Sequence, residues 1–293
     1  MPSTPKLVSM LAELVASPSV SSTQVALDQG NLGVIEILAG WLVDLGFETE
    51  ILPLPNAPHK ANLIATLGPG PGGLVLAGHT DTVPYNEERW LSDPLGLTEK
   101  DNRLYGLGTC DMKGFFPLAI EAARAFVDQT LSAPLIILAT ADEESSMAGA
   151  EALVELGRPQ ARYAVIGEPT GMRPIYQHKS IMMERILVRG QAGHSSDPSL
   201  GNSALEAMHE VIGRLIRYRE GLQQAHRNDS FRINVPTMNL GCIHGGDNPN
   251  RICGQCELHF DARLLPGMSN QSVRNDVREL VAEVARERQL DIV

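Results

Sequence analysis

The hydrophobic positions of the chain follow a helical period in some segments and an extended one in others. Apolar residues keep helical spacing from Leu7 onwards, and a second helix is expected over residues 24–45. Short apolar runs, each compact enough for a sheet strand buried on both faces, follow at residues 62–67, 74–77, 135–140 and 163–166. Helical spacing over 112–127 and 147–156 separates several of these runs. The pattern predicts an α/β domain with a central mixed, largely parallel sheet flanked by helices.

The pattern changes from about Ser180, where strand-like alternation becomes dominant. Strands are expected over residues 183–189, 237–242 and 255–263, and helices over 202–219 and 270–288. This combination predicts a smaller α+β domain. A chain of 293 residues is long enough for two domains of ordinary size.

Composition and charge exclude several classes of partner. With 24 basic and 35 acidic residues, the formal net charge is -11, so the protein repels a phosphate backbone and nucleic acid is not an expected partner. The sequence has no run of eighteen apolar residues, and no membrane span or secretory signal is expected. Four cysteines are too few for a disulfide scaffold in a chain of this length. We therefore expect a cytoplasmic protein.

Polar residues that can bind metal follow the apolar runs of the first domain. They are His79, Asp111, the adjacent pair Glu143 and Glu144, and Glu168. One acidic residue after a strand is more often a helix cap or a solvated charge. Several at successive strand ends converge on one edge of a sheet, where their mutual repulsion calls for a polyvalent cation.

Charge counting favours two metal ions. Asp111, Glu144 and Glu168 bring three negative charges, and a hydroxide would add a fourth to balance two dications. Mixed histidine and carboxylate ligands suit Zn²⁺, Co²⁺ or Mn²⁺ better than Mg²⁺ or Ca²⁺. Adjacent glutamates can both face the metals only from an irregular turn, so one should bind metal while the other acts as general base. Asp81, two residues after His79, is expected to orient that imidazole; a turn cap is the alternative.

The candidate metal-binding residues, taken in their order along the chain, resemble those of a family of di-zinc metallopeptidases and deacylases. The family includes acetylornithine deacetylases, succinyl-diaminopimelate desuccinylases, aminoacylases and carboxypeptidase G-type enzymes. The motifs that match are Gly78-His79-Thr80-Asp81-Thr82-Val83-Pro84, Gly106-Leu107-Gly108 with Asp111-Met112-Lys113-Gly114, Asp142-Glu143-Glu144 and Gly167-Glu168-Pro169-Thr170. Those most similar to the acetylornithine branch are Gly193-His194-Ser195-Ser196-Asp197-Pro198, His244-Gly245-Gly246-Asp247 and Asn250-Arg251-Ile252-Cys253.

The resemblance implies hydrolysis of an N-acyl amino acid, with acetylornithine as first choice and a succinylated diamino acid or a dipeptide as alternatives. It implies that His79, Asp111 and Glu168 bind one Zn²⁺, that Asp111 bridges to a second Zn²⁺ held by Glu144, and that Glu143 is the base. It also implies a homodimer through a lid domain. There His194 would reach the partner's site to stabilise the oxyanion, and Asn250 and Arg263 would bind the substrate carboxylate. Without the resemblance, His194 would be predicted to be a histidine in a turn, and Arg263 to be a solvent-exposed arginine.

The resemblance also sets the expected domain limits. It implies a catalytic part over residues 1–179, a lid over 180–287, and the start of a return to the catalytic domain over 288–293. The family's second metal takes a histidine from a later segment, and none of the histidines here is assigned to that role. We therefore expect polypeptide 1–293 to be poorly active; an inactive, metal-binding homologue is the alternative reading.

The cysteines carry no assigned chemistry. Cys253-Gly254-Gln255-Cys256 lacks the second ligand pair of a zinc knuckle, so packing in a strand is expected. Cys110, beside Asp111, has no adjacent base and is expected to fill space in the interior.

Overall fold

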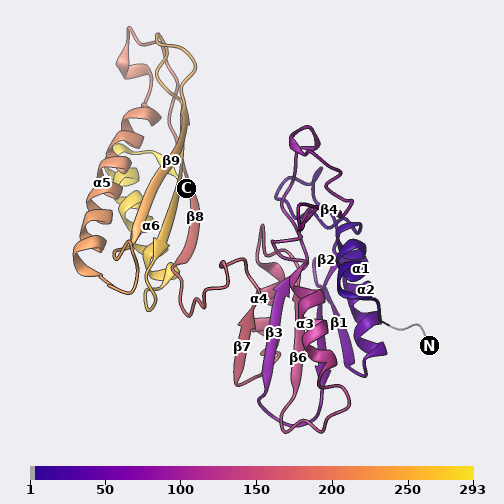
Figure 1. Ribbon diagram of the computed structural model, residues 1–293. Helices are drawn as coiled ribbons and strands as arrows, with labels where there is room; N and C mark the ends of the chain where they lie inside the picture. Colours follow the sequence, from indigo (N-terminus) through magenta and orange to yellow (C-terminus); the bar gives the residue numbers. More distant parts are fainter. Residues whose placement is uncertain (1–3) are drawn as a thin grey trace. The chain divides into compact units, whose positions relative to one another are not determined.

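The computed structural model describes residues 4–293, which form two compact units, residues 4–173 and residues 174–293 (Figure 1). Each unit has its own sheet and its own hydrophobic core. The mixed α/β first unit and the α+β second unit confirm the predicted fold class.

The first unit is built on a five-stranded mixed sheet with strand order β1-β2-β6-β3-β7. Its strands are β1 (Glu48–Leu54), β2 (Ala57–Leu67), β3 (Leu74–His79), β6 (Leu135–Thr140) and β7 (Tyr163–Ile166). The pairs β1-β2 and β2-β6 are antiparallel, whereas β3 pairs in parallel with both β6 and β7. This parallel half brings the carboxyl ends of β6, β3 and β7 to one edge, where the candidate ligands follow.

Helices cover both faces of this sheet. The helices are α1 (Leu7–Val15), α2 (Leu32–Asp44), α3 (Phe115–Arg124) and α4 (Ala148–Leu156). One core joins α1, α2 and α3 to the sheet through fully buried residues such as Leu14, Leu38, Phe116 and Ile137. On the other face, Leu153 of α4 packs against Ile64, Val75 and Ile136. Outside the main sheet lie the short elements η1 (Glu87–Arg89), β4 (Thr98–Lys100) and β5 (Arg103–Tyr105).

Two sequence expectations for the first unit are wrong in detail. The second helix begins at Leu32, because residues 24–30 form a loop in which Val25 is 92% exposed. The side chain of Asn31 instead bonds the backbone of Ala61, which joins this loop to β2. Strand β7 is not buried on both faces: Tyr163 and Ile166 are 62% and 64% exposed. Among residues 4–293, β7 pairs only with β3, so it is an edge strand.

The second unit is a four-stranded antiparallel sheet with two long helices. Its strand order is β11-β8-β10-β9, with β8 (Ser180–Arg189), β9 (Thr237–Gly245), β10 (Gln255–Leu264) and β11 (Asp291–Ile292). Even-numbered residues of β10, including Leu258 and Phe260, are buried in a core with α5 (Ala204–Ala225) and α6 (Asn270–Arg288). The odd-numbered residues of β10 therefore lie on the face away from these helices. The short helix η2 (Pro198–Leu200) precedes α5.

Within the part of the chain that the structure describes, no helix combines the length and the apolar character needed to cross a membrane.

Candidate metal centre and active site

The candidate ligands meet at the edge of the sheet in the first unit. His79 is the last residue of β3, Glu143 and Glu144 follow β6, and Glu168 follows β7. The Nε2 atom of His79 lies 3.1 Å from Asp111 Oδ1, 3.7 Å from Glu168 Oε1 and 3.9 Å from Glu143 Oε2. Ligand atoms of His79, Asp111 and Glu144 all lie within 4.8 Å of one another. The fold thus gathers one imidazole and four carboxylates that are scattered over ninety positions of sequence.

The imidazole of His79 is held in an orientation that suits metal binding. Its Nδ1 lies 2.9 Å from the backbone carbonyl oxygen of Asp81, and the ring is buried. Because a carbonyl oxygen only accepts hydrogen bonds, Nδ1 carries a proton, and Nε2 is the ring nitrogen that faces the carboxylates. Carboxylate Oδ1 of Asp81 is further from Nδ1, at 3.6 Å.

The carboxylate of Asp81 instead holds the loop after β6. It accepts hydrogen bonds from the backbone N–H of Glu143 at 3.2 Å and of Glu144 at 3.0 Å. Asp81 is 2% exposed, so these bonds are protected from water. Asp81 lies beside His79, and it also holds the backbone of Glu143 and Glu144 in place directly after β6.

The loop itself is the irregular turn that the adjacent glutamates require. Asp142 has a φ of 58°, in the left-handed region, and residues 143–146 form a turn before α4. Asn62 joins the two ends of the segment, since it accepts from Ala141 N at 3.0 Å and donates to Gly149 O at 2.8 Å.

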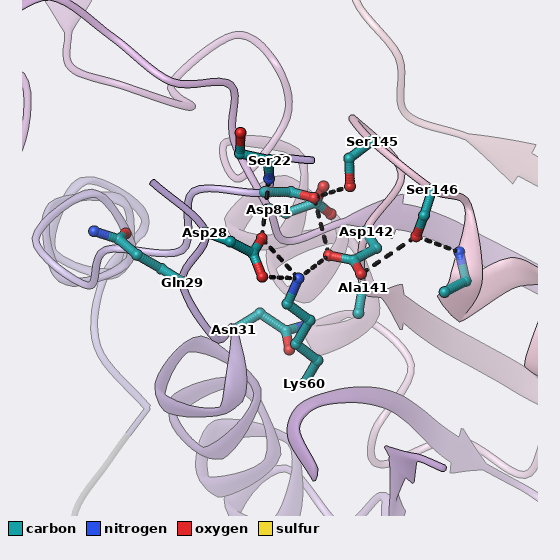
Figure 2. A network of polar contacts seen from close by, with 12 residues as sticks. Ser22, Asp28, Gln29, Asn31, Lys60, Asp81, Ala141, Asp142, Ser145 and Ser146 are labelled. Atoms are coloured by element: carbon teal, nitrogen blue, oxygen red, sulfur yellow. Dashed lines mark hydrogen bonds and ion pairs between the residues drawn. The ribbon is translucent and has the colours of Figure 1, made fainter. Parts of the chain in front are cut away.

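A buried polar network below the turn was not predicted from the sequence (Figure 2). Lys60 Nζ lies 2.7 Å from Asp142 Oδ1 and 2.7 Å from Asp28 Oδ2. Ser21 donates to Asp142 Oδ1 at 2.9 Å, and its hydroxyl also bonds that of Ser145. A lysine two residues before the apolar run 62–67 was the available signal, because a buried lysine needs anionic partners. Its partners come from positions far away in the sequence.

Electrostatics at the edge of the sheet reflect crowded negative charge. Burial, followed by the neighbouring Asp111 carboxylate, raises the pKa of Glu144 to about 7. Burial also raises the pKa of Glu168 and outweighs the opposing effect of His79. Burial depresses the pKa of His79, but the surrounding carboxylates, with Asp81 first, reverse this and leave it raised. Each shift means that the cluster favours added positive charge, which a dication supplies.

Two residues of the motif around Asp111 differ in environment. Lys113 is buried and donates to the carbonyl oxygens of Leu14 and Ser17 at 3.1 and 2.7 Å. Burial lowers its pKa to about 8. Cys110 is exposed, so the expectation that it fills the interior is wrong.

The remaining candidates lie in the second unit. Ser195 N, next to His194, donates to Asn250 O at 3.0 Å, so the two loops adjoin. The N–H of Ser196 donates to His194 Nδ1 at 3.2 Å, and the Ser196 hydroxyl lies 2.8 Å from the same nitrogen, so Nδ1 is bonded within the turn. Arg263 on β10 bonds Asp261 Oδ1 at 3.2 Å. Cys253 and Cys256 are buried in the core of this unit, as expected for packing, but only Cys256 lies in a strand, because β10 begins at Gln255.

Comparison with known proteins decides the family. Residues 75–291 match Peptidase family M20/M25/M40. The chain belongs to this family. It is 50% identical over 281 residues to an acetylornithine deacetylase of Klebsiella pneumoniae (strain 342), covering 96% of this chain and 73% of that protein. It is 52% identical over 277 residues to an acetylornithine deacetylase of Edwardsiella ictaluri (strain 93-146), covering 94% and 71%.

Solved structures share the fold of this M20 family chain. An M20 family metallo-carboxypeptidase from Sulfolobus solfataricus superposes with a TM-score of 0.73 at 16% identity, over 99% of this chain and 77% of that one. A tripeptidase from Staphylococcus aureus superposes with a TM-score of 0.67 at 19% identity, over 98% and 74%. At these identities the likeness concerns the fold.

The residues of this M20 family chain fit a metal centre. The Nε2 atom of His79 and a carboxylate oxygen of Asp111 lie 3.1 Å apart, and imidazole nitrogen and carboxylate oxygen are both ligand types that Zn²⁺-like dications bind. The chain is a metal-dependent amide hydrolase by family, and His79, Asp111 and Glu144 form the group that can hold a metal ion.

Proposed function

We propose that this protein hydrolyses the amide bond of N-acetylornithine, giving ornithine and acetate in arginine biosynthesis. The observation that carries the proposal is the cluster of His79 with four carboxylates at the edge of the sheet, in a chain whose relatives at about half identity are named acetylornithine deacetylase. Zn²⁺ is the proposed ion, with Co²⁺ or Mn²⁺ as substitutes, because the donor set mixes nitrogen and oxygen.

The proposed ligands are those around His79. His79, Asp111 and Glu168 would hold one ion, and Asp111 and Glu144 would contribute to a second. When bound, the ions supply Lewis acidity, which polarises the acyl carbonyl and makes water more acidic. All remaining chemistry falls to side chains of the protein.

Glu143 is the proposed general base. Its Oε2 lies 3.9 Å from His79 Nε2 and its side chain is 39% exposed, so it is beside the ligands and open to substrate. Glu143 takes a proton from the attacking water while the water oxygen bonds the acyl carbon. It then gives this proton to the amine nitrogen as the C–N bond breaks. Its neighbour Glu144, on the same turn, is a proposed metal ligand.

His194, Asn250 and Arg263 are the proposed substrate-contacting residues of the second unit. The imidazole of His194 would donate to an oxyanion through Nε2, because its Nδ1 is bonded within the turn, and the guanidinium of Arg263 suits a carboxylate. We propose that the protein is a homodimer through this unit, in which His194 acts on the partner's substrate. The proposed location is the cytoplasm, in keeping with four unpaired cysteines.

A comparative assay tests the proposal. Purified protein with Zn²⁺ would be given acetylornithine, succinyl-diaminopimelate and acetylmethionine, and the same assay would be run on a chain extended to the length of the relatives. We expect the highest kcat/KM for acetylornithine. A higher kcat/KM for another of the three would assign the substrate to that compound. Metal binding without hydrolysis of any of them by the longer chain would show an inactive homologue.

A further inference from the structure

The second unit carries four potential metal ligands on the open face of its sheet. They are Cys242 and His244 on β9 and Glu257 and His259 on β10. In the antiparallel register, Glu257 lies opposite His244 and His259 lies opposite Cys242. Cross-strand neighbours have Cβ atoms about 4.5–5.5 Å apart, so the four side chains form one compact patch.

All four side chains point away from the helices. On β10, Cys256 and Leu258 are buried in the core with α5 and α6, so the alternating residues Glu257 and His259 face the other way. His244 and His259 are exposed, and Cys242 is partly exposed. The patch is therefore accessible from solution within this unit.

The ligand atoms already form two close pairs. Cys242 Sγ lies 3.0 Å from His244 Nε2, and His259 Nε2 lies 2.5 Å from Glu257 Oε1. The rings of His244 and His259 are perpendicular, with centroids 6.5 Å apart. Because His259 lies directly opposite Cys242 in the strand pairing, rotation of the His259 side chain is the change that would bring its ring toward the sulfur.

We propose that Cys242, His244 and His259, with Glu257, form a second and separate metal site for a thiophilic dication of the Zn²⁺ type. One thiolate, two imidazoles and one carboxylate are a tetrahedral ligand set that Zn²⁺ prefers. Two ligands at alternate positions of β9 and two at alternate positions of β10 are held by the sheet, so little chain entropy is lost on binding. The ion would join β9 to β10 on the face that the helices leave open.

The sulfur ligand distinguishes this site from the cluster around His79, whose proposed ligands are nitrogen and oxygen. Titration of the full chain with Co²⁺ should give an intense near-ultraviolet band from thiolate-to-metal charge transfer. The band should be lost in Cys242→Ser and strongly weakened in His259→Ala. It should persist in His79→Ala, in which the proposed catalytic ligand is removed. That last result would hold even if the proposed hydrolysis were wrong.

Cys110→Ser is the matched control, because Cys110 is an exposed cysteine beside Asp111. It should keep the band. Zn²⁺ stoichiometry by calorimetry should fall by one per chain in Cys242→Ser relative to Cys110→Ser. Absence of the band from the unaltered chain under excess Co²⁺, or its retention in Cys242→Ser, would show that the patch is not a metal site.

Discussion

Lys60 Nζ lies 2.7 Å from Asp142 Oδ1, and the two side chains are only 7% and 10% exposed. The pair connects β2 to the residue directly before Glu143. A buried ion pair of this kind is strongly destabilising when one partner is removed, because the other charge stays in the interior. The proposed base and ligand therefore depend on a lysine that contacts no metal ligand.

Lys60→Met should lower the free energy of unfolding by about 3–5 kcal/mol. Urea denaturation followed by circular dichroism measures this change. The control is Arg158→Met, which removes the exposed ion pair with Glu50 at 2.6 Å. We expect a much smaller change there, because water screens that pair. Equal changes in the two variants would contradict a special role for the buried network.

Asp81→Asn should loosen the turn that carries both glutamates. An asparagine has one acceptor oxygen where the carboxylate uses two, and its NH₂ group would face a backbone N–H. We expect a loss of about 1–3 kcal/mol in the free energy of unfolding, and a Zn²⁺ affinity lower by about 10–100-fold. Competition with a chelator measures the affinity. Asp197→Asn, which alters a similar turn cap in the second unit, should leave it unchanged.

Glu143→Gln and Glu144→Gln should separate catalysis from metal binding. Loss of a general base lowers kcat by about 10²–10⁴-fold, so Glu143→Gln should be nearly inactive with its metal content intact. Glu144→Gln should retain less metal after dialysis. Glu155→Gln, an exposed glutamate of α4, is the control for both. If Glu143→Gln hydrolysed substrate at the normal rate, another residue would be the base.

The pH dependence of stability should show the contribution of Asp28. Burial raises the pKa of Asp28, but Lys60, aided by Ser22 N and His59, more than reverses this and leaves it below the ordinary 3.8. The folded state then binds fewer protons than the unfolded state near this pH. Asp28 therefore stabilises the fold above its ordinary pKa, and this contribution is lost as the pH falls through the folded-state value.

Urea unfolding between pH 5 and pH 3 in the presence of EDTA tests this. The range spans the ordinary aspartate pKa of about 3.8, below which the contribution of Asp28 should begin to fall. The unaltered chain should lose more stability over this range than Asp28→Asn. Asp128→Asn, a change at an exposed aspartate, should behave as the unaltered chain does. A steeper loss in Asp28→Asn would reverse the sign and refute the argument.

Local pattern determined much of this protein without reference to contacts. Strand β6 and helix α6 have the bounds that the apolar periods predict, because a buried element must present apolar residues at its own period. The convergence of His79, Glu143, Glu144 and Glu168 also followed from sequence, since the ends of neighbouring parallel strands share one edge.

Tertiary structure decided what local pattern does not encode. Strand β1 depends on pairing with β2, and the late start of α2 goes with the bonds between Asn31 and Ala61 of β2, rather than with their own periodicity. The partners of Lys60 and the bonds from Asp81 to the turn join residues that are distant in sequence, and the register of β9 and β10 places Cys242 opposite His259. Hydrogen bonds and ion pairs act over a few ångströms of space, and which residues come that close is settled only when the sheets have formed.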